Sequence, residues 1–171
     1  MAKAMDDRAE GRSPIVGMRW LLGFAGAVKT LAHSFRLGVR GLVVDRRDGR
    51  TDHVLLVRHT YVSGWYLPGG GVEAGESAGA ALVRELAEET GVELLGAARL
   101  HGVYLNPRRS RRDHVVCYVV DDFRCPPVHV PDLEIAEARF FPADALPADT
   151  TRATRARIDE VLRGAPVSEL W

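Results

Sequence analysis

The chain has 171 residues, a length that suits one domain of ordinary size with an appended segment. Its 23 Lys and Arg residues balance 23 Asp and Glu residues, so the overall charge predicts no polyanionic partner, and we expect no specific nucleic acid. The 46% hydrophobic content is enough for a packed core and excludes a wholly disordered chain. Any affinity for phosphate must therefore come from a local site or a bound cation.

The two cysteines, Cys117 and Cys125, are too few for a disulfide framework or a four-cysteine zinc site. Cys117 lies within the apolar run 114–120, which predicts a small buried side chain. The longest uncharged apolar stretch, 20–28, is far shorter than the roughly 20 residues needed to cross a bilayer. Three acidic residues among the first ten are atypical of a secretory leader, so we expect a cytoplasmic protein.

Residues 1–36 are predicted to form a tail and an amphipathic helix ahead of the main domain. Between residues 15 and 35, large apolar residues recur at steps of three and four, which is typical of one helix face. These residues are Trp20, Phe24, Val28, Leu31 and Phe35. The segment carries Arg19 and Lys29 but no acid, so contact with an anionic membrane surface is one interpretation. Packing against the domain, or against a second subunit in a homodimer, is the other.

From residue 37 onward the hydrophobic pattern predicts alternating strands and helices. The predicted elements are strands at 37–44 and 53–57, a helix at 77–90, strands near 98–104, 114–120 and 138–141, and a helix ending near residue 163. An Asp-Gly turn at 45–49 joins the first two strands as a hairpin. Gly91 is placed to end the first helix, and Thr150 or Thr151 to cap the last. This order predicts an α/β domain over 37–171, with a mixed sheet covered on both faces.

Three glutamates in the helix at 77–90 form the main candidate site. Glu85, Glu88 and Glu89 stand at positions i, i+3 and i+4, so their carboxylates project from one face. Like charges at this spacing destabilise a helix by a few tenths of a kcal/mol, so helix stability does not account for them. Magnesium prefers oxygen ligands and would gather such carboxylates. The alternative interpretation is an ordinary solvated charged face.

Neighbouring residues favour the metal site over the solvated face. Arg84 can neutralise and orient part of the carboxylate cluster by reaching Glu88 or the upstream Glu76. The glycine run at 69–71 allows a backbone carbonyl to approach a cation closely.

The stretch 70–92 resembles the Nudix box: G, five residues, E, seven residues, R-E, an aliphatic residue, one residue, E-E, one residue, G, an aliphatic residue. Nine positions match at fixed spacing, which makes this a specific signal. They are Gly70, Glu76, Arg84, Glu85, Leu86, Glu88, Glu89, Gly91 and Val92. A looser similarity runs from about residue 37 to residue 163.

The resemblance implies a Nudix-type α/β/α sandwich with a central mixed sheet, and a pyrophosphohydrolase that uses Mg²⁺, with Mn²⁺ as an alternative. It implies metal ligands at Gly70 (through its carbonyl), Glu85, Glu88 and Glu89. Glu76 and Arg84 would support these ligands and so belong to the catalytic set. Glu89 is the first candidate to accept a proton from the attacking water, and Glu134, in a loop before a strand, is the second.

The implied substrate is a nucleoside diphosphate linked to another group: a nucleotide sugar, an ADP-ribose-like molecule or an oxidised nucleotide. Three alternatives stay open, namely an RNA 5′-end pyrophosphohydrolase, a non-catalytic nucleotide-sensing module and a membrane-associated enzyme acting on a lipid-linked diphosphate. Four arginines in one loop could grip a second phosphate or an RNA backbone, or could simply be solvated: Arg108, Arg109, Arg111 and Arg112. Trp65 and Tyr66 are candidates for base stacking or for packing.

Overall fold

A computed structural model describes residues 35–46, 49, 51–125 and 133–171. The tail and helix predicted at the N-terminus therefore lie, as far as residue 34, outside the described residues. Within the described part of the chain, no helix is long and apolar enough to cross a membrane.

Five strands form one mixed sheet in the order β4-β5-β1-β2-β7. Their bounds are β1 Arg36–Asp45, β2 His53–His59, β4 Arg99–Leu105, β5 Asp113–Val120 and β7 Ile135–Pro142. Strands β1 and β5 run parallel, and the other neighbours are antiparallel. Two further strands, β3 (Glu93–Leu94) and β6 (Phe123–Arg124), form a small antiparallel pair that the sequence did not predict. Elements of two residues carry no hydrophobic period, which explains the omission.

The two helices begin and end where local signals predict. In α2 (Ala78–Thr90), the Ser77 hydroxyl accepts a hydrogen bond from the backbone N–H of Ala80, and Gly91 ends the helix with a φ of 69°. In α3 (Arg152–Leu162), the cap is Thr151 rather than Thr150, and its hydroxyl accepts from the N–H of Thr154.

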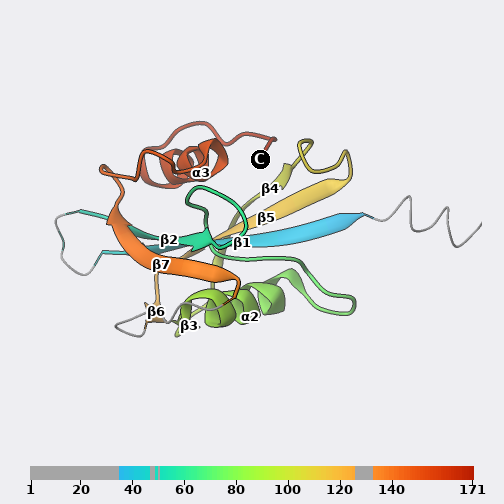
Figure 1. Cartoon of the computed structure of the whole chain (residues 1–171), viewed down its shortest axis with the longest axis horizontal. Helices are drawn as coiled ribbons and strands as arrows, with labels where there is room; N and C mark the ends of the chain where they lie inside the picture. Colours follow the sequence, from blue (N-terminus) through green and yellow to red (C-terminus); the bar gives the residue numbers. More distant parts are fainter. Residues whose placement is uncertain (1–34, 47–48, 50, 126–132) are drawn as a thin grey trace, which may run out of the picture. The chain divides into compact units, whose positions relative to one another are not determined.

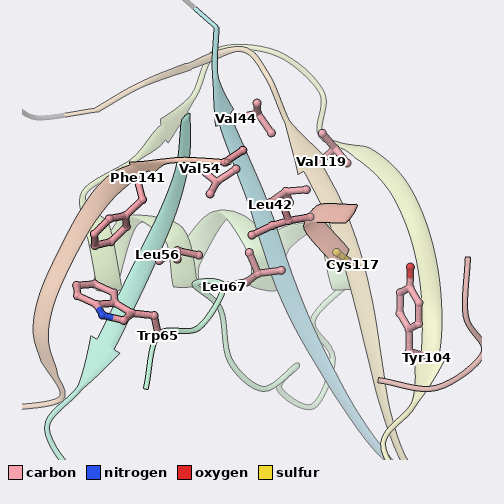
Figure 2. Packing of buried hydrophobic residues seen from close by; sticks show 12 residues of the cluster. Leu42, Val44, Val54, Leu56, Trp65, Leu67, Tyr104, Cys117, Val119 and Phe141 are labelled. Atoms are coloured by element: carbon pink, nitrogen blue, oxygen red, sulfur yellow. The ribbon is translucent and has the colours of Figure 1, made fainter. Parts of the chain in front are cut away.

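Helices α2 and α3 cover opposite faces of the sheet (Figure 1). Successive residues of β1 alternate between the two sides: Val43 packs with Leu82 of α2, and Leu42 packs with Ile158 of α3. Figure 2 shows the α3 side of the core. There the rings of Trp65 and Phe141 pack edge-to-face, with 4.7 Å between the ring centroids. The predicted α/β/α sandwich is confirmed, and Trp65 is a packing residue rather than an exposed base-stacking platform.

The predicted hairpin of β1 and β2 is present but short. The strands pair at Val44–Val54 and Asp45–His53 and then separate, and residues 66–72 enter the space between them. The inserted chain exchanges two hydrogen bonds with Val57 through Tyr66, at 3.0 and 2.9 Å. On its other side it accepts hydrogen bonds from β1, where Gly41 N–H bonds to the Pro68 carbonyl at 2.9 Å and Val39 N–H to that of Gly70 at 2.9 Å. The glycine run is thereby fixed between the sheet and α2.

Helix α2 can approach the sheet this closely because β1 has a glycine beneath it. A Cβ atom at Gly41 would lie 3.1 Å from a methyl carbon of Leu82 and 3.1 Å from one of Leu86. We expect Gly41→Val to lower the free energy of unfolding by about 1–3 kcal/mol, because it overpacks this contact. Gly79→Ala is the control, since a Cβ there meets nothing within 4 Å, and it should be neutral or slightly stabilising. Urea denaturation measures both; equal midpoints for Gly41→Val and the wild type would contradict the close approach.

Candidate functional site

The predicted site residues lie around a cleft of about 600 Å³. Its walls come from β1, the glycine run, α2 and the loop between β4 and β5. Six of the seven residues predicted to bind the metal or to support catalysis line it: Gly70, Arg84, Glu85, Glu88, Glu89 and Glu134. Glu76 does not line the cleft, but it pairs with Arg84, which does.

Glu89 is a buried acid that lines the cleft. Its side chain is held by a hydrogen bond of 2.6 Å from the N–H of Gly69 to the Oε2 atom. Burial raises the pKa of Glu89 to about 7, although the Gly69 hydrogen bond and the charge of Arg40 act in the opposite direction. A nearby cation would therefore strongly stabilise the ionised form of this buried carboxylate.

Arg84 organises the other acids of the box. Its guanidinium forms a two-pronged pair with Glu76, in which Nε and an NH₂ group each lie 3.0 Å from a carboxylate oxygen. The NH₂ group that pairs with Glu76 also donates to the Gly71 carbonyl at 3.0 Å. The other NH₂ group donates to Glu85 at 2.9 Å and to Glu88 at 3.2 Å. The carboxylates raise the pKa of Arg84, and Arg84 lowers the pKa of Glu76.

Gly70 lies directly against the carboxylate of Glu85. A Cβ atom at this position would be 2.3 Å from Glu85 Oε1, so no other residue fits without moving the glutamate. The Gly70 carbonyl already accepts a hydrogen bond from the N–H of Val39 at 2.9 Å. Because a carbonyl oxygen has two lone pairs, its predicted role as a metal ligand requires the second.

A histidine that the sequence analysis did not single out joins the acids. The ligand atoms of His59, Glu89 and Glu134 all lie within 4.8 Å of one another, so among the described residues these three could share one cation. Burial, followed by the charge of Arg40, lowers the pKa of His59 and favours the neutral imidazole that binds metals. Tyr61 donates a hydrogen bond of 3.3 Å to Glu134.

The four arginines of the β4–β5 loop separate in space. Arg109 lines the cleft, whereas Arg108 lines a second cavity beside α3. The loop is closed by Asn106, whose side-chain NH₂ donates to the buried Asp113 carboxylate at 2.8 Å and whose backbone N–H donates to the Asp113 carbonyl at 2.8 Å. Neither Arg111 nor Arg112 lines either cavity.

Comparison with known families accounts for this arrangement. A sequence model of the NUDIX domain matches residues 35–162, which spans the whole sheet, α2 and α3. The chain belongs to the Nudix family. Hydrolases of this family generally use a divalent metal, which agrees with the acidic cleft of this Nudix domain.

Individual relatives belong to the same family but are named for different activities. A Bacillus subtilis protein provisionally named 8-oxo-dGTP diphosphatase is 43% identical over 65 residues, covering 38% of this chain and 43% of the relative. The RNA pyrophosphohydrolase of Halorhodospira halophila is 44% identical over 77 residues, covering 42% of this chain and 41% of the relative. This Nudix chain thus spans about two fifths of the length of both. The crystal structure of a MutT Nudix hydrolase from Burkholderia pseudomallei is 29% identical, with a TM-score of 0.62 over 74% of this chain and 97% of its own.

Sequence reasoning missed several residues of this Nudix cleft, among them Arg40, His59 and Asp113. Two of them, Arg40 and Asp113, left a weak signal in the sequence. Arg40 interrupts the apolar run of β1, and Asp113 directly precedes the apolar run of β5. A charge inside a buried strand is costly unless it meets a partner or a ligand, so these positions could have been questioned from the sequence.

The Glu76–Arg84 pair predicts a pH dependence of stability. The pKa of Glu76 lies below its ordinary value of 4.5 in the folded protein, mainly because of hydrogen bonds from Arg84. Its contribution is therefore fully present above pH 4.5 and is lost as the pH falls through the folded-state pKa. We expect Glu76→Gln to lower the free energy of unfolding near pH 6. Below pH 4.5, the variant's free energy of unfolding should change less steeply with pH than that of the wild type. Urea unfolding at several pH values measures this, and identical slopes for variant and wild type would refute the pairing.

Proposed function

We propose that this Nudix domain uses a divalent cation, Mg²⁺ in the first instance, to hydrolyse a phosphoanhydride bond in a small nucleoside diphosphate derivative. The observation that carries the proposal is the buried carboxylate of Glu89 at a cleft that Glu85, Glu88 and Glu134 also line. Four acids around one cavity repel one another, and Glu85 and Glu134 both raise the pKa of Glu89. A divalent cation would offset that repulsion and attract the phosphates of a nucleotide.

The donor set suits a hard cation. Glu85, Glu88 and Glu89 would hold it, with the second lone pair of the Gly70 carbonyl, and a further ion could use Glu134 and His59. All but one of these donors are oxygen atoms, the kind that Mg²⁺ and Mn²⁺ prefer, and the imidazole would suit Mn²⁺ better than Mg²⁺. Arg84 would keep Glu85 and Glu88 in position through its hydrogen bonds to both.

The reaction proposed is substitution at phosphorus by water. When bound, the cation would neutralise charge that develops on the anhydride oxygens. The water oxygen forms the new P–O bond, the anhydride P–O bond breaks, and its electron pair leaves with the departing phosphate. Glu89 is the first candidate to accept the proton of the water, because its carboxylate lines the cleft beside the proposed cation site. Glu134, at the edge of the same cleft, is the second candidate.

RNA with a 5′ di- or triphosphate is a second candidate substrate. It is supported by the exposed arginines of the β4–β5 loop and by the similarity to the RNA pyrophosphohydrolase of Halorhodospira halophila. The neutral overall charge does not favour a long polyanion, so we place small nucleotides first. A non-catalytic sensing role is less well supported, because every acid of the box is present and lines or supports the cleft.

Glu89→Gln tests the proposal. We expect turnover of the best substrate in a panel of nucleotides with Mg²⁺ to fall by at least about 100-fold. The amide oxygen can still accept from Gly69, and an amide resembles the protonated acid that a pKa of about 7 favours, so stability near neutral pH should change little.

Glu93→Gln is the matched control, because it removes one negative charge from β3, outside the cleft, and should leave turnover unchanged. Wild-type turnover in Glu89→Gln would contradict the assigned role. A wild-type protein inactive towards the whole panel, including 5′-triphosphate RNA, would instead favour the sensing module.

A further inference from the structure

Arg40 is the feature of the cleft that the proposed chemistry leaves unused. It lies in the middle of β1, in the central strand of the sheet, and lines the cleft together with Glu85 and Glu89. Its neighbours on both sides, Val39 and Gly41, belong to the buried core. A charged residue here costs folding free energy unless it serves a ligand or a partner.

Within the described residues, Arg40 has no ion-pair partner. Its guanidinium makes one hydrogen bond, 3.0 Å long, to the carbonyl of Val39. Burial lowers its pKa, and the charges of Glu89 and Glu85 raise it, so the acids are near without being hydrogen-bonded. A guanidinium has five N–H donors, and this hydrogen bond uses one of them.

Arg109 brings a second guanidinium to the same cleft. Both residues line this cleft, and the charge of Arg109 lowers the pKa of Arg40. The repulsion is sustained by the loop, which the Asn106–Asp113 hydrogen bonds close around Arg109. Among the residues that the structure describes, no acid is paired with either side chain, and an anion between them would relieve their repulsion.

We propose that Arg40 and Arg109 form the site for the second phosphate of the substrate, in the same cleft as the carboxylates that would hold the cation. This inference rests on the proposed function, in which the cation binds the first phosphate. Arginine suits the role because its planar donors can bind two phosphate oxygens at once.

The charge of the site selects a class of substrate. Two cations are balanced by an anion of charge near −2, which a terminal phosphate carries above its second pKa of about 6. An internal phosphate, esterified on both sides, carries one negative charge and gains about half the Coulomb energy. The preferred substrate is therefore a nucleotide that ends in a free phosphate, rather than a nucleotide sugar or an ADP-ribose-like diester.

Binding of two matched analogues tests this directly. α,β-Methylene-ADP ends in a free phosphate and α,β-methylene-ADP-ribose does not, and water cannot hydrolyse the P–C–P bridge of either. With the full chain in excess Mg²⁺ at pH 8, isothermal titration calorimetry should show tighter binding of the first analogue. Arg40→Gln and Arg109→Gln should each weaken it by about 10- to 100-fold, which corresponds to one charge-assisted contact.

Arg108→Gln is the matched control: it removes the same charge from the adjacent residue, which lines the other cavity, and should change affinity less than twofold. Equal affinity of the wild type for the two analogues, or equal losses in all three variants, would overturn the inference.

A second measurement separates phosphate binding from a merely structural role of Arg40. Without nucleotide, Mn²⁺ should bind Arg40→Gln as tightly as the wild type or more tightly, because a cation near the carboxylates has been removed. Weaker Mn²⁺ binding would show that Arg40 only holds the acids in place, and would overturn the inference. If the variants lose analogue binding while the wild type hydrolyses nothing, the phosphate site stands and the proposed function fails. If the wild type hydrolyses nucleotides and Arg40→Gln has the same KM as the wild type, the proposed function stands and the phosphate site fails.

Discussion

The cleft depends on one buried contact, the hydrogen bond from the N–H of Gly69 to the carboxylate of Glu89. It joins the chain inserted between β1 and β2 to the helix that carries the acids. Gly69 has a φ of 130°, and a Cβ there would lie 2.4 Å from the carbonyl oxygen of Val39. The position therefore requires glycine for two reasons, and through it the sheet fixes where the acidic end of α2 can lie.

The second organising feature is the presence, within one cavity, of both acids and arginines that are unpaired in the described part of the chain. Acids from α2 and the edge of β7 line this cavity, and Arg40 and Arg109 come from β1 and the β4–β5 loop. Among the described residues, Arg84 is the cation that pairs directly with box acids, which leaves the other two arginines available to an anion. A cation and a diphosphate together would satisfy both sets of side chains. The protein is thus neutral overall while its cleft carries charges of both signs.

Much of this could be predicted from local sequence. The caps Ser77 and Gly91 and the spacing of the glutamates follow from helix geometry, and the nine fixed positions of the box identify the family. What could not be predicted depends on contacts between distant segments. His59 approaches Glu134 because β2 pairs with β7, and Arg109 rather than Arg108 faces the cleft because of how the Asn106–Asp113 turn closes. Neither pairing leaves a periodic signal within its own segment.

The central claim is that Glu89 and its neighbours gather a divalent cation at this cleft. Crystals of the full chain grown with Mn²⁺ and a non-hydrolysable nucleotide allow a direct test by anomalous scattering. We predict a manganese peak in contact with the Glu89 carboxylate, with Glu85 or Glu88 among its other ligands and a phosphate oxygen of the nucleotide beside it. Ordered nucleotide in the cleft with no manganese peak within bonding distance of Glu89 would contradict the claim.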